Sequence, residues 1–201
     1  MVIELVKGVA LLLALRLMQS VNIRFWRKHN IAGQVSAGIL FGAICVAGMM
    51  MPIVVAPGVI FDARSIVLSM AGLFGGALVG GVAALIAAGY RVWLGGAGVT
   101  VGITVALASV VLGLLYRYAV GKGWVKIGVV QLLLFGLLVH VLVALLFTQL
   151  PADIAEQVLG NVSLPLLLTF APTTPFLGLL LQDGVRQNIM PSQLLIHITV
   201  E

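Results

Sequence analysis

Two arginines stand in stretches of this sequence that are otherwise strongly apolar. Arg64 ends the tripeptide Asp62-Ala63-Arg64, and Arg91 follows Tyr90 just before a glycine-rich stretch. A guanidinium group stays charged and binds carboxylates through a planar fork of donors. We therefore expect Arg64 and Arg91 to bind an anion, with Asp62 orienting one of them. The alternative is that each arginine extends to the lipid headgroups or pairs with Asp62.

Five further residues are candidate ligand contacts, namely Gly95, Gly96, Gly98, His140 and Asn161. The three glycines form a loop directly after the second arginine, and its backbone N–H groups could face an anion, although a tight turn is the simpler interpretation. His140 lies in the middle of an apolar run, where it is either a ligand contact or a neutral histidine hydrogen-bonded between helices. Asn161 lies near prolines that can kink a helix and free its carbonyl groups for binding.

No pattern in the sequence is typical of catalysis or of a metal centre. There is no glycine-rich phosphate loop followed by lysine, and no histidine–carboxylate cluster at metal-ligand spacing. We therefore expect no catalytic residue, no metal and no cofactor in this chain.

The composition places these residues in a lipid bilayer. Of the 201 residues, 62% are hydrophobic and only 8% are charged, whereas soluble domains have about 25% charged residues. The net charge of +5 does not indicate nucleic-acid binding, because the basic residues stand at the ends of apolar runs, where the positive-inside rule places them. The single cysteine, Cys45, forms no intrachain disulfide and is expected to be a small buried side chain.

The apolar runs predict an all-α fold, a polytopic membrane bundle of six segments. A helix needs about 20 apolar residues to cross a bilayer, so five of the runs are expected to be single spans. The run at 65–90 is longer and is interrupted by two adjacent glycines. The six runs are approximately 2–20, 33–50, 65–90, 99–119, 126–147 and 159–182.

The run at 65–90 is either one tilted helix or a hairpin of two short helices that turns at Gly75-Gly76. Each arm would cover only about 15–20 Å, so the hairpin would be re-entrant and its tip would be buried in protein. The hairpin places the basic loops on one, cytoplasmic, side, whereas a single span breaks the positive-inside rule. The hairpin is therefore favoured. It brings Arg64 and Arg91 together at the outer face, whereas one straight helix would separate them by about 40 Å.

Four blocks of the sequence, covering positions 62–66, 71–76, 80–81 and 90–98, resemble the LytS-YhcK type transmembrane sensor region, the 5TM-5TMR_LYT family. The resemblance extends from about Asn22 to about Leu181. This family is the membrane input module of bacterial sensor histidine kinases and diguanylate cyclases, and it is distantly similar to the substrate-binding subunits of vitamin transporters. Some relatives sense small carboxylates such as pyruvate, which implies that the two arginines are carboxylate contacts. At Gly102 and Val105, where some members carry polar side chains, this sequence departs from the pattern, which favours a larger or more apolar ligand.

The resemblance implies a ligand-sensing domain over residues 1–186, followed at 187–201 by the start of a cytoplasmic linker to a missing output domain. It also implies a homodimer in the bacterial inner membrane, with several spans and a cytoplasmic C-terminus. Its partners would be a small anionic molecule and the lipid bilayer, with no nucleic acid. Two alternatives stay open, a substrate-binding subunit of a transporter and a sensor of membrane state that binds no ligand.

Overall fold

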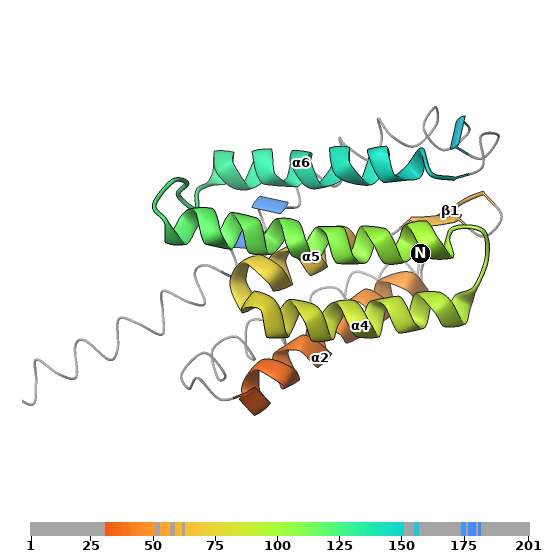
Figure 1. Ribbon diagram of the computed structural model, residues 1–201, viewed down its shortest axis with the longest axis horizontal. Coiled ribbons are helices and arrows are strands. Elements are labelled where there is room, and N and C mark those ends of the chain that lie inside the picture. The colour runs from red at the N-terminus through yellow and green to blue at the C-terminus, as the bar shows by residue number, and fades with distance from the viewer. Residues whose placement is uncertain are drawn as a thin grey trace, which may run out of the picture.

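Helices make up most of the part of the chain that this computed structural model describes. The described residues are 31–50, 53–56, 59–61, 63–150, 155–156, 174–175, 177–179 and 181. The predicted run at 2–20 and most of the run at 159–182 lie outside them, so the prediction of six segments is not confirmed. The helical elements in chain order are α2 (Ile31–Met50), α3 (Arg64–Met70), the π-helix η1 (Ala71–Gly75), α4 (Gly76–Leu94), α5 (Val99–Gly121) and α6 (Val129–Phe147) (Figure 1).

Among the described residues, four helical stretches are long and apolar enough to cross a membrane. They are Ile31–Met50, Arg64–Leu94, Val99–Gly121 and Val129–Phe147. Many leucine and valine side chains on these helices are exposed, including Leu85, Leu107 and Leu145. Such side chains suit a lipid environment, because the hydrocarbon of the bilayer takes the place of water. The expected class, a helical membrane bundle, is confirmed at this level.

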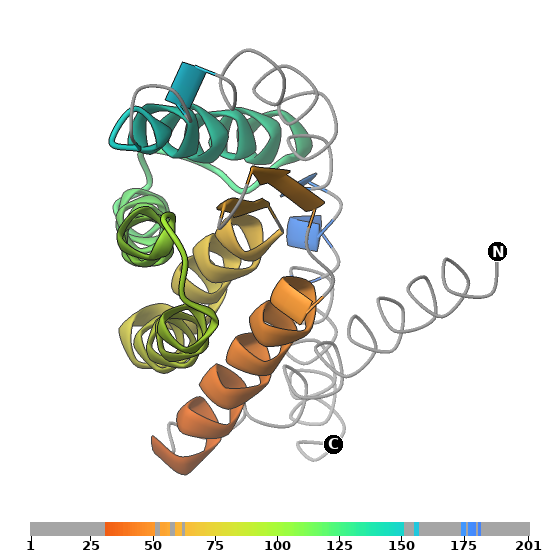
Figure 2. The same ribbon diagram turned by 90° about the vertical axis from the view of Figure 1, so that its right-hand side faces the viewer.

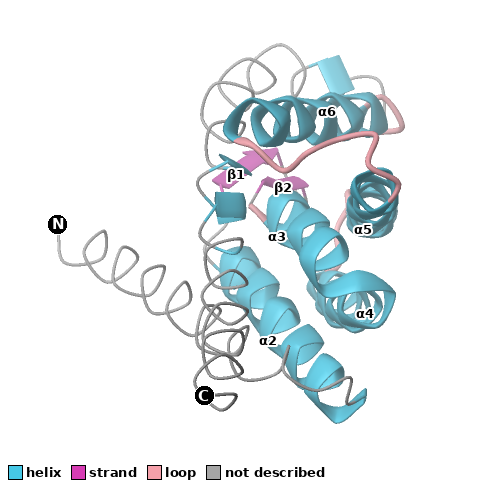
Figure 3. Cartoon of the chain, turned by 90° about the vertical axis from the view of Figure 1, so that its left-hand side faces the viewer, coloured by secondary structure: helices cyan, strands magenta, loops and turns pink. Residues whose placement is uncertain are grey.

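The stretch from Arg64 to Leu94 is broken and does not form one straight rod. At the end of η1, Gly76 has φ +85° and ψ −169°, a conformation that is essentially restricted to glycine. A Cβ atom at Gly80 would lie 3.3 Å from the Cα of Gly72, although the two residues would be about 12 Å apart in a continuous helix. The chain therefore doubles back, and α3 with η1 forms a short re-entrant arm beside α4 (Figure 3).

Glycines set the packing of this arm and of the neighbouring helices. A Cβ atom at Gly38 would lie 2.6 Å from the Cβ of Val82, and one at Gly42 would lie 2.8 Å from the Cβ of Ile86. Since both numbers increase together, α2 and α4 run parallel. On α5, a Cβ atom at Gly113 would overlap the carbonyl oxygen of Ser69 in α3. Small residues allow helix backbones to approach closely in membranes.

One β-hairpin interrupts the otherwise helical fold. Strands β1 (Ile53–Ala56) and β2 (Val59–Phe61) pair antiparallel, with Ile53 opposite Phe61. The hairpin lies at the end of the bundle where the loop between α4 and α5 is found, as the view onto that end shows (Figure 2). The all-α prediction did not include it. The strands form here because the β-branched and aromatic residues of this segment favour extended backbone. The turn-forming pair Pro57-Gly58 lies between the two strands in the sequence.

Candidate functional site

Arg64 begins the re-entrant arm and is buried, with 7% of its surface exposed. Its Nη1 donates a hydrogen bond to the Sδ of Met49, at 3.1 Å. Met49 is the penultimate residue of α2 and is itself buried. The contact therefore ties the start of the arm to the end of a neighbouring spanning helix.

Arg91 lies in the last turn of α4 and is 2% exposed. Its Nη1 donates a hydrogen bond of 2.6 Å to the carbonyl oxygen of Gly95. The positive charge thus lies at the C-terminal end of α4, where the helix dipole favours a cation. This hydrogen bond fastens the guanidinium to the first residue of the glycine-rich loop.

Gly102 provides the space in which the Arg91 side chain lies. A Cβ atom at Gly102 would be 2.9 Å from the Nε of Arg91 and 3.0 Å from its Cγ. The stem of Arg91 therefore lies directly against the backbone of α5. From the sequence, the glycine was interpreted as room for a larger or more apolar ligand, but in the structure Arg91 fills that room.

The two arginines lie at the same end of the bundle. The parallel register of α2 and α4 brings Met49, the partner of Arg64, level with the last residues of α4, just beyond Arg91. Ser69 lies against Gly113, and Arg117, one turn further along α5, reaches Leu73 and Phe74, so α3 with η1 runs parallel to α5. Arg64, at the start of α3, therefore lies on the side of the bundle where α5 begins. These contacts place both arginines towards the same end of the described helices, and their joint role in one anion site stays a prediction.

The glycine-rich loop between α4 and α5 is a tight turn. Gly95 and Gly96 have φ values of +68° and +91°, which favour glycine. The Val99 N–H donates to the carbonyl of Gly96 at 3.2 Å, and the Gly102 N–H donates to the carbonyl of Gly98 at 2.8 Å. Gly98 is the N-cap residue of α5. These bonds support the turn, and a role of the loop in anion binding stays a prediction.

The other predicted contacts are not joined to this group by the structure. His140 is buried half-way along α6, where its Nδ1 is hydrogen-bonded at 2.6 Å to the carbonyl of Gly136 in its own helix. This hydrogen bond lies within α6. The predicted hydrogen bond from His140 to another helix stays a prediction. Asp62 and Asn161 lie outside the described residues. Among the described residues, no group of three or more histidine, cysteine or acidic side chains could hold a metal ion.

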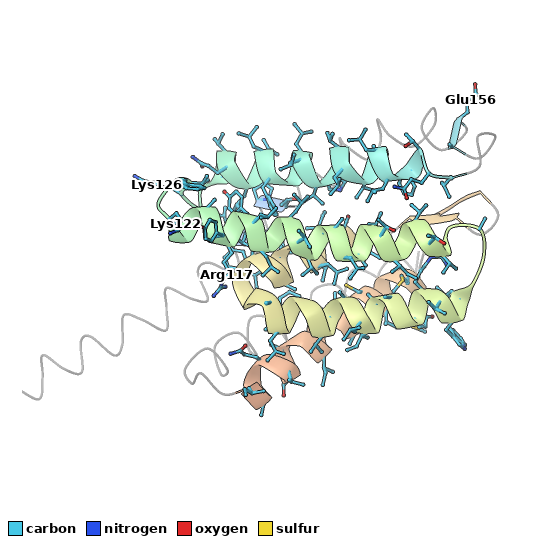
Figure 4. The ribbon with its side chains drawn as sticks, in the orientation of Figure 1. Arg117, Lys122, Lys126 and Glu156 are labelled. Carbon is cyan, nitrogen blue, oxygen red and sulfur yellow. The ribbon has the colours of Figure 1, made fainter. Side chains whose placement is uncertain are left out.

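The opposite end of the bundle is basic. Arg117, Lys122 and Lys126 gather at the end of α5 and in the loop after it, whereas Glu156 lies at the far end (Figure 4). Aromatic pairs mark both ends. The Tyr90 and Trp93 rings pack at a tilt of 35° with centroids 5.4 Å apart at the arginine end, and the Tyr118 and Trp124 rings meet edge to face at 6.0 Å at the basic end. Tryptophan and tyrosine are enriched at both surfaces of a membrane.

Sequence reasoning missed two residues that contact functional elements. Met49 carries no signal in the sequence, because its role depends on the register between α2 and α4. Arg117 was interpreted only as a cytoplasmic charge, but its Nη1 donates to the carbonyl oxygens of Leu73 and Phe74 at the hairpin tip. The predicted burial of that tip could have indicated that some donor must cap it.

Residues 18–184 match the model of one protein family, which is described as "5TMR of 5TMR-LYT". The match covers most of the chain and includes both arginines, the hairpin and the glycine-rich loop. Searches of the curated proteins and of the solved structures give no match. The similarity to vitamin-transporter subunits is therefore not confirmed.

Proposed function

We propose that this chain, which belongs to the 5TM-5TMR_LYT family of membrane sensor regions, is the ligand-sensing input domain of a bacterial signalling protein. The ligand is a small molecule with a carboxylate group, held by Arg64 and Arg91. The burial of these two guanidinium groups at one end of a membrane bundle is the observation that carries the proposal. Ionisable residues inside a membrane domain are costly and are generally found where a substrate or ion binds.

The charge distribution supports an outward-facing site. Basic residues concentrate on the cytoplasmic side of membrane proteins, and Arg117, Lys122 and Lys126 gather at the end opposite to the arginine pair (Figure 4). In this orientation the basic end faces the cytoplasm of a bacterial inner membrane. Arg64 and Arg91 then lie towards the outer side, from which a ligand in the environment would arrive.

The hydrogen bonds of the arginines support a carboxylate ligand. Arg64 donates to a thioether sulfur and Arg91 to a backbone carbonyl, and both acceptors are uncharged. A carboxylate forms shorter and stronger charge-assisted hydrogen bonds with a guanidinium, often two at once. A ligand carboxylate would therefore be a stronger acceptor than either of these two groups. In the proposal the glycine-rich loop closes over the ligand and Asp62 orients one arginine, while His140 and Asn161 remain candidate contacts.

Signalling requires that the ligand favour one packing of the helices over another. Arg64 and Arg91 lie on the two arms of one hairpin, and Gly102 of α5 touches Arg91, so a ligand bridging the arginines acts on three helical elements. The output is histidine kinase or diguanylate cyclase activity in a homodimer, as in other signalling proteins with this type of input region.

Pyruvate is a suitable probe, because it is a small carboxylate with a second acceptor. The protein in lipid nanodiscs is heated with and without pyruvate, and a ligand at 100 times its Kd should stabilise the fold by about 2.7 kcal/mol. Arg64→Gln and Arg91→Gln should each weaken binding by about tenfold or more, since each removes a charged hydrogen bond. Lys126→Gln, which removes a positive charge at the opposite end, should bind as the parent does.

Unchanged affinity in both arginine variants would reject the arginine clamp. If no small carboxylate stabilises the parent protein, the result favours a sensor of membrane state that binds no ligand. Uptake of labelled pyruvate by cells that contain this chain would favour the transporter alternative.

A further inference from the structure

Arg117 contacts the tip of the re-entrant arm from the neighbouring helix. Its Nη1 donates hydrogen bonds to the carbonyl oxygen of Leu73 at 3.0 Å and to that of Phe74 at 2.8 Å. These carbonyls belong to the last turn of η1, more than 40 residues away in the sequence. Arg117 lies beside the turn that joins η1 to α4 (Figure 4).

The end of the arm needs such a donor. The last carbonyls of any helix lack partners within the helix and carry the negative end of its dipole. The arm ends beside α4 and α5 in a bundle that crosses the membrane, where unsatisfied backbone groups are costly. The guanidinium lies directly beside this turn, because a Cβ atom at Gly76 would be in ordinary van der Waals contact with the Cζ of Arg117, at 3.7 Å.

Part of the remaining contact between the arm and α5 is backbone against backbone. Gly72 faces the carbonyl oxygen of Val110, and Gly113 faces Ser69 and the backbone nitrogen of Leu73. At these glycines the two backbones come close together without interlocking side chains. The charged hydrogen bonds of Arg117 add a directional contact at the tip of the arm.

The arm connects the Arg117 contact at its tip to Arg64 at its other end. Its 7 residues in α3 and 5 in η1 span about 18 Å from the tip to Arg64. The π-helical turn between them is a form that often occurs at functional positions and converts to α-helix by a one-residue change of register. A shift at the tip therefore moves Arg64 relative to Arg91.

We propose that Arg117 is a positioning residue, which fixes the axial position of the re-entrant arm and thereby holds Arg64 at the proposed ligand site. The part that concerns the ligand rests on the proposed function. The coupling between the two sites is reciprocal. If the Arg117 contact raises the affinity for a ligand at Arg64 by some factor, then bound ligand strengthens the Arg117 contact by the same factor.

Amide hydrogen exchange on the whole chain in lipid nanodiscs, without ligand, tests the structural part. Arg117→Gln removes the charge and should raise exchange over residues 64–75 by about tenfold. Lys122→Gln is the matched control, since it removes a positive charge at the same end from a side chain that lies 5.5 Å from the Tyr118 ring centroid. It should leave exchange over this segment unchanged. Equal exchange in the two variants would overturn the proposal whether or not any ligand binds.

Pyruvate affinity then separates positioning from stability alone. Arg117→Gln should weaken pyruvate binding by about tenfold, Arg117→Lys should recover part of it, and Lys122→Gln should stay within about twofold. An Arg117→Gln protein that exchanges faster but keeps the parental affinity would also overturn the proposal. If the parent binds no pyruvate, the carboxylate function fails instead, and the exchange experiment still decides whether Arg117 holds the arm.

Discussion

Gly113 is the position at which the packing of the re-entrant arm can be tested most directly. A Cβ atom there would overlap the carbonyl oxygen of Ser69 and lie 2.9 Å from the backbone nitrogen of Leu73. Both neighbours are backbone atoms of α3 and η1, so they cannot rotate away as a flexible side chain does. Gly113→Ala must therefore push α5 and the arm apart.

The expected cost follows from two opposing effects. Overpacking of a tight contact costs up to about 3 kcal/mol, and the upper value applies because the backbone must move. Alanine in a helix offsets about 1 kcal/mol of this relative to glycine, which leaves a net destabilisation of about 2 kcal/mol. At Gly81 in α4 a Cβ atom would have nothing within 4 Å, so Gly81→Ala should stabilise the helix by up to about 1 kcal/mol.

Thermal unfolding of the two variants in the same nanodiscs measures the difference. A gap of about 3 kcal/mol should place the Tm of Gly113→Ala about 6–12 °C below that of Gly81→Ala. Gly89→Ala, another α4 position with open space around a Cβ atom, serves as a second control and should behave like Gly81→Ala. If Gly113→Ala melts with or above these controls, the arm does not pack on α5 as described.

Two further substitutions test the contacts of the arginines. Gly102→Ala should displace the flexible Arg91 side chain and thereby weaken pyruvate binding by about tenfold, while the Tm changes little. An unchanged Kd for pyruvate would show that the placement of Arg91 on α5 is unimportant for binding. Met49→Leu nearly keeps the volume of the side chain but removes the sulfur acceptor, and it should cost about 1 kcal/mol of unfolding free energy. In an Arg64→Gln background the same change should cost less, and equal costs in a double-mutant cycle would contradict the contact between Arg64 and Met49.

The break in the apolar run could be predicted because its cause is local. Gly75-Gly76 interrupts the helix, and the positions of the basic residues choose between the rod and the hairpin. The convergence of Arg64 and Arg91 follows from that turn alone. These conclusions need only the order of residues along the chain and the approximate rise of a helix.

Other features depend on how helices align with one another, which composition does not specify. The partner of Arg64 is a methionine on α2, and the cap of the hairpin tip is Arg117 on α5. Gly102 was interpreted through the ligand, whereas its neighbour is the Arg91 side chain. The strands β1 and β2 were not predicted because they have only 4 and 3 residues, far fewer than the apolar runs that indicate spanning helices.

The turn at Gly75–Gly76 also affects how the topology of the chain is counted. Hydropathy alone finds four candidate spans in the described residues, and treating Arg64–Leu94 as one crossing puts Ala56 and Lys122 on the same side of the bilayer. Because the chain returns at its paired glycines, those two residues lie on opposite sides. Single cysteines introduced at positions 56 and 122 of a Cys45→Ala protein should therefore react with a membrane-impermeant thiol reagent from opposite faces of oriented vesicles.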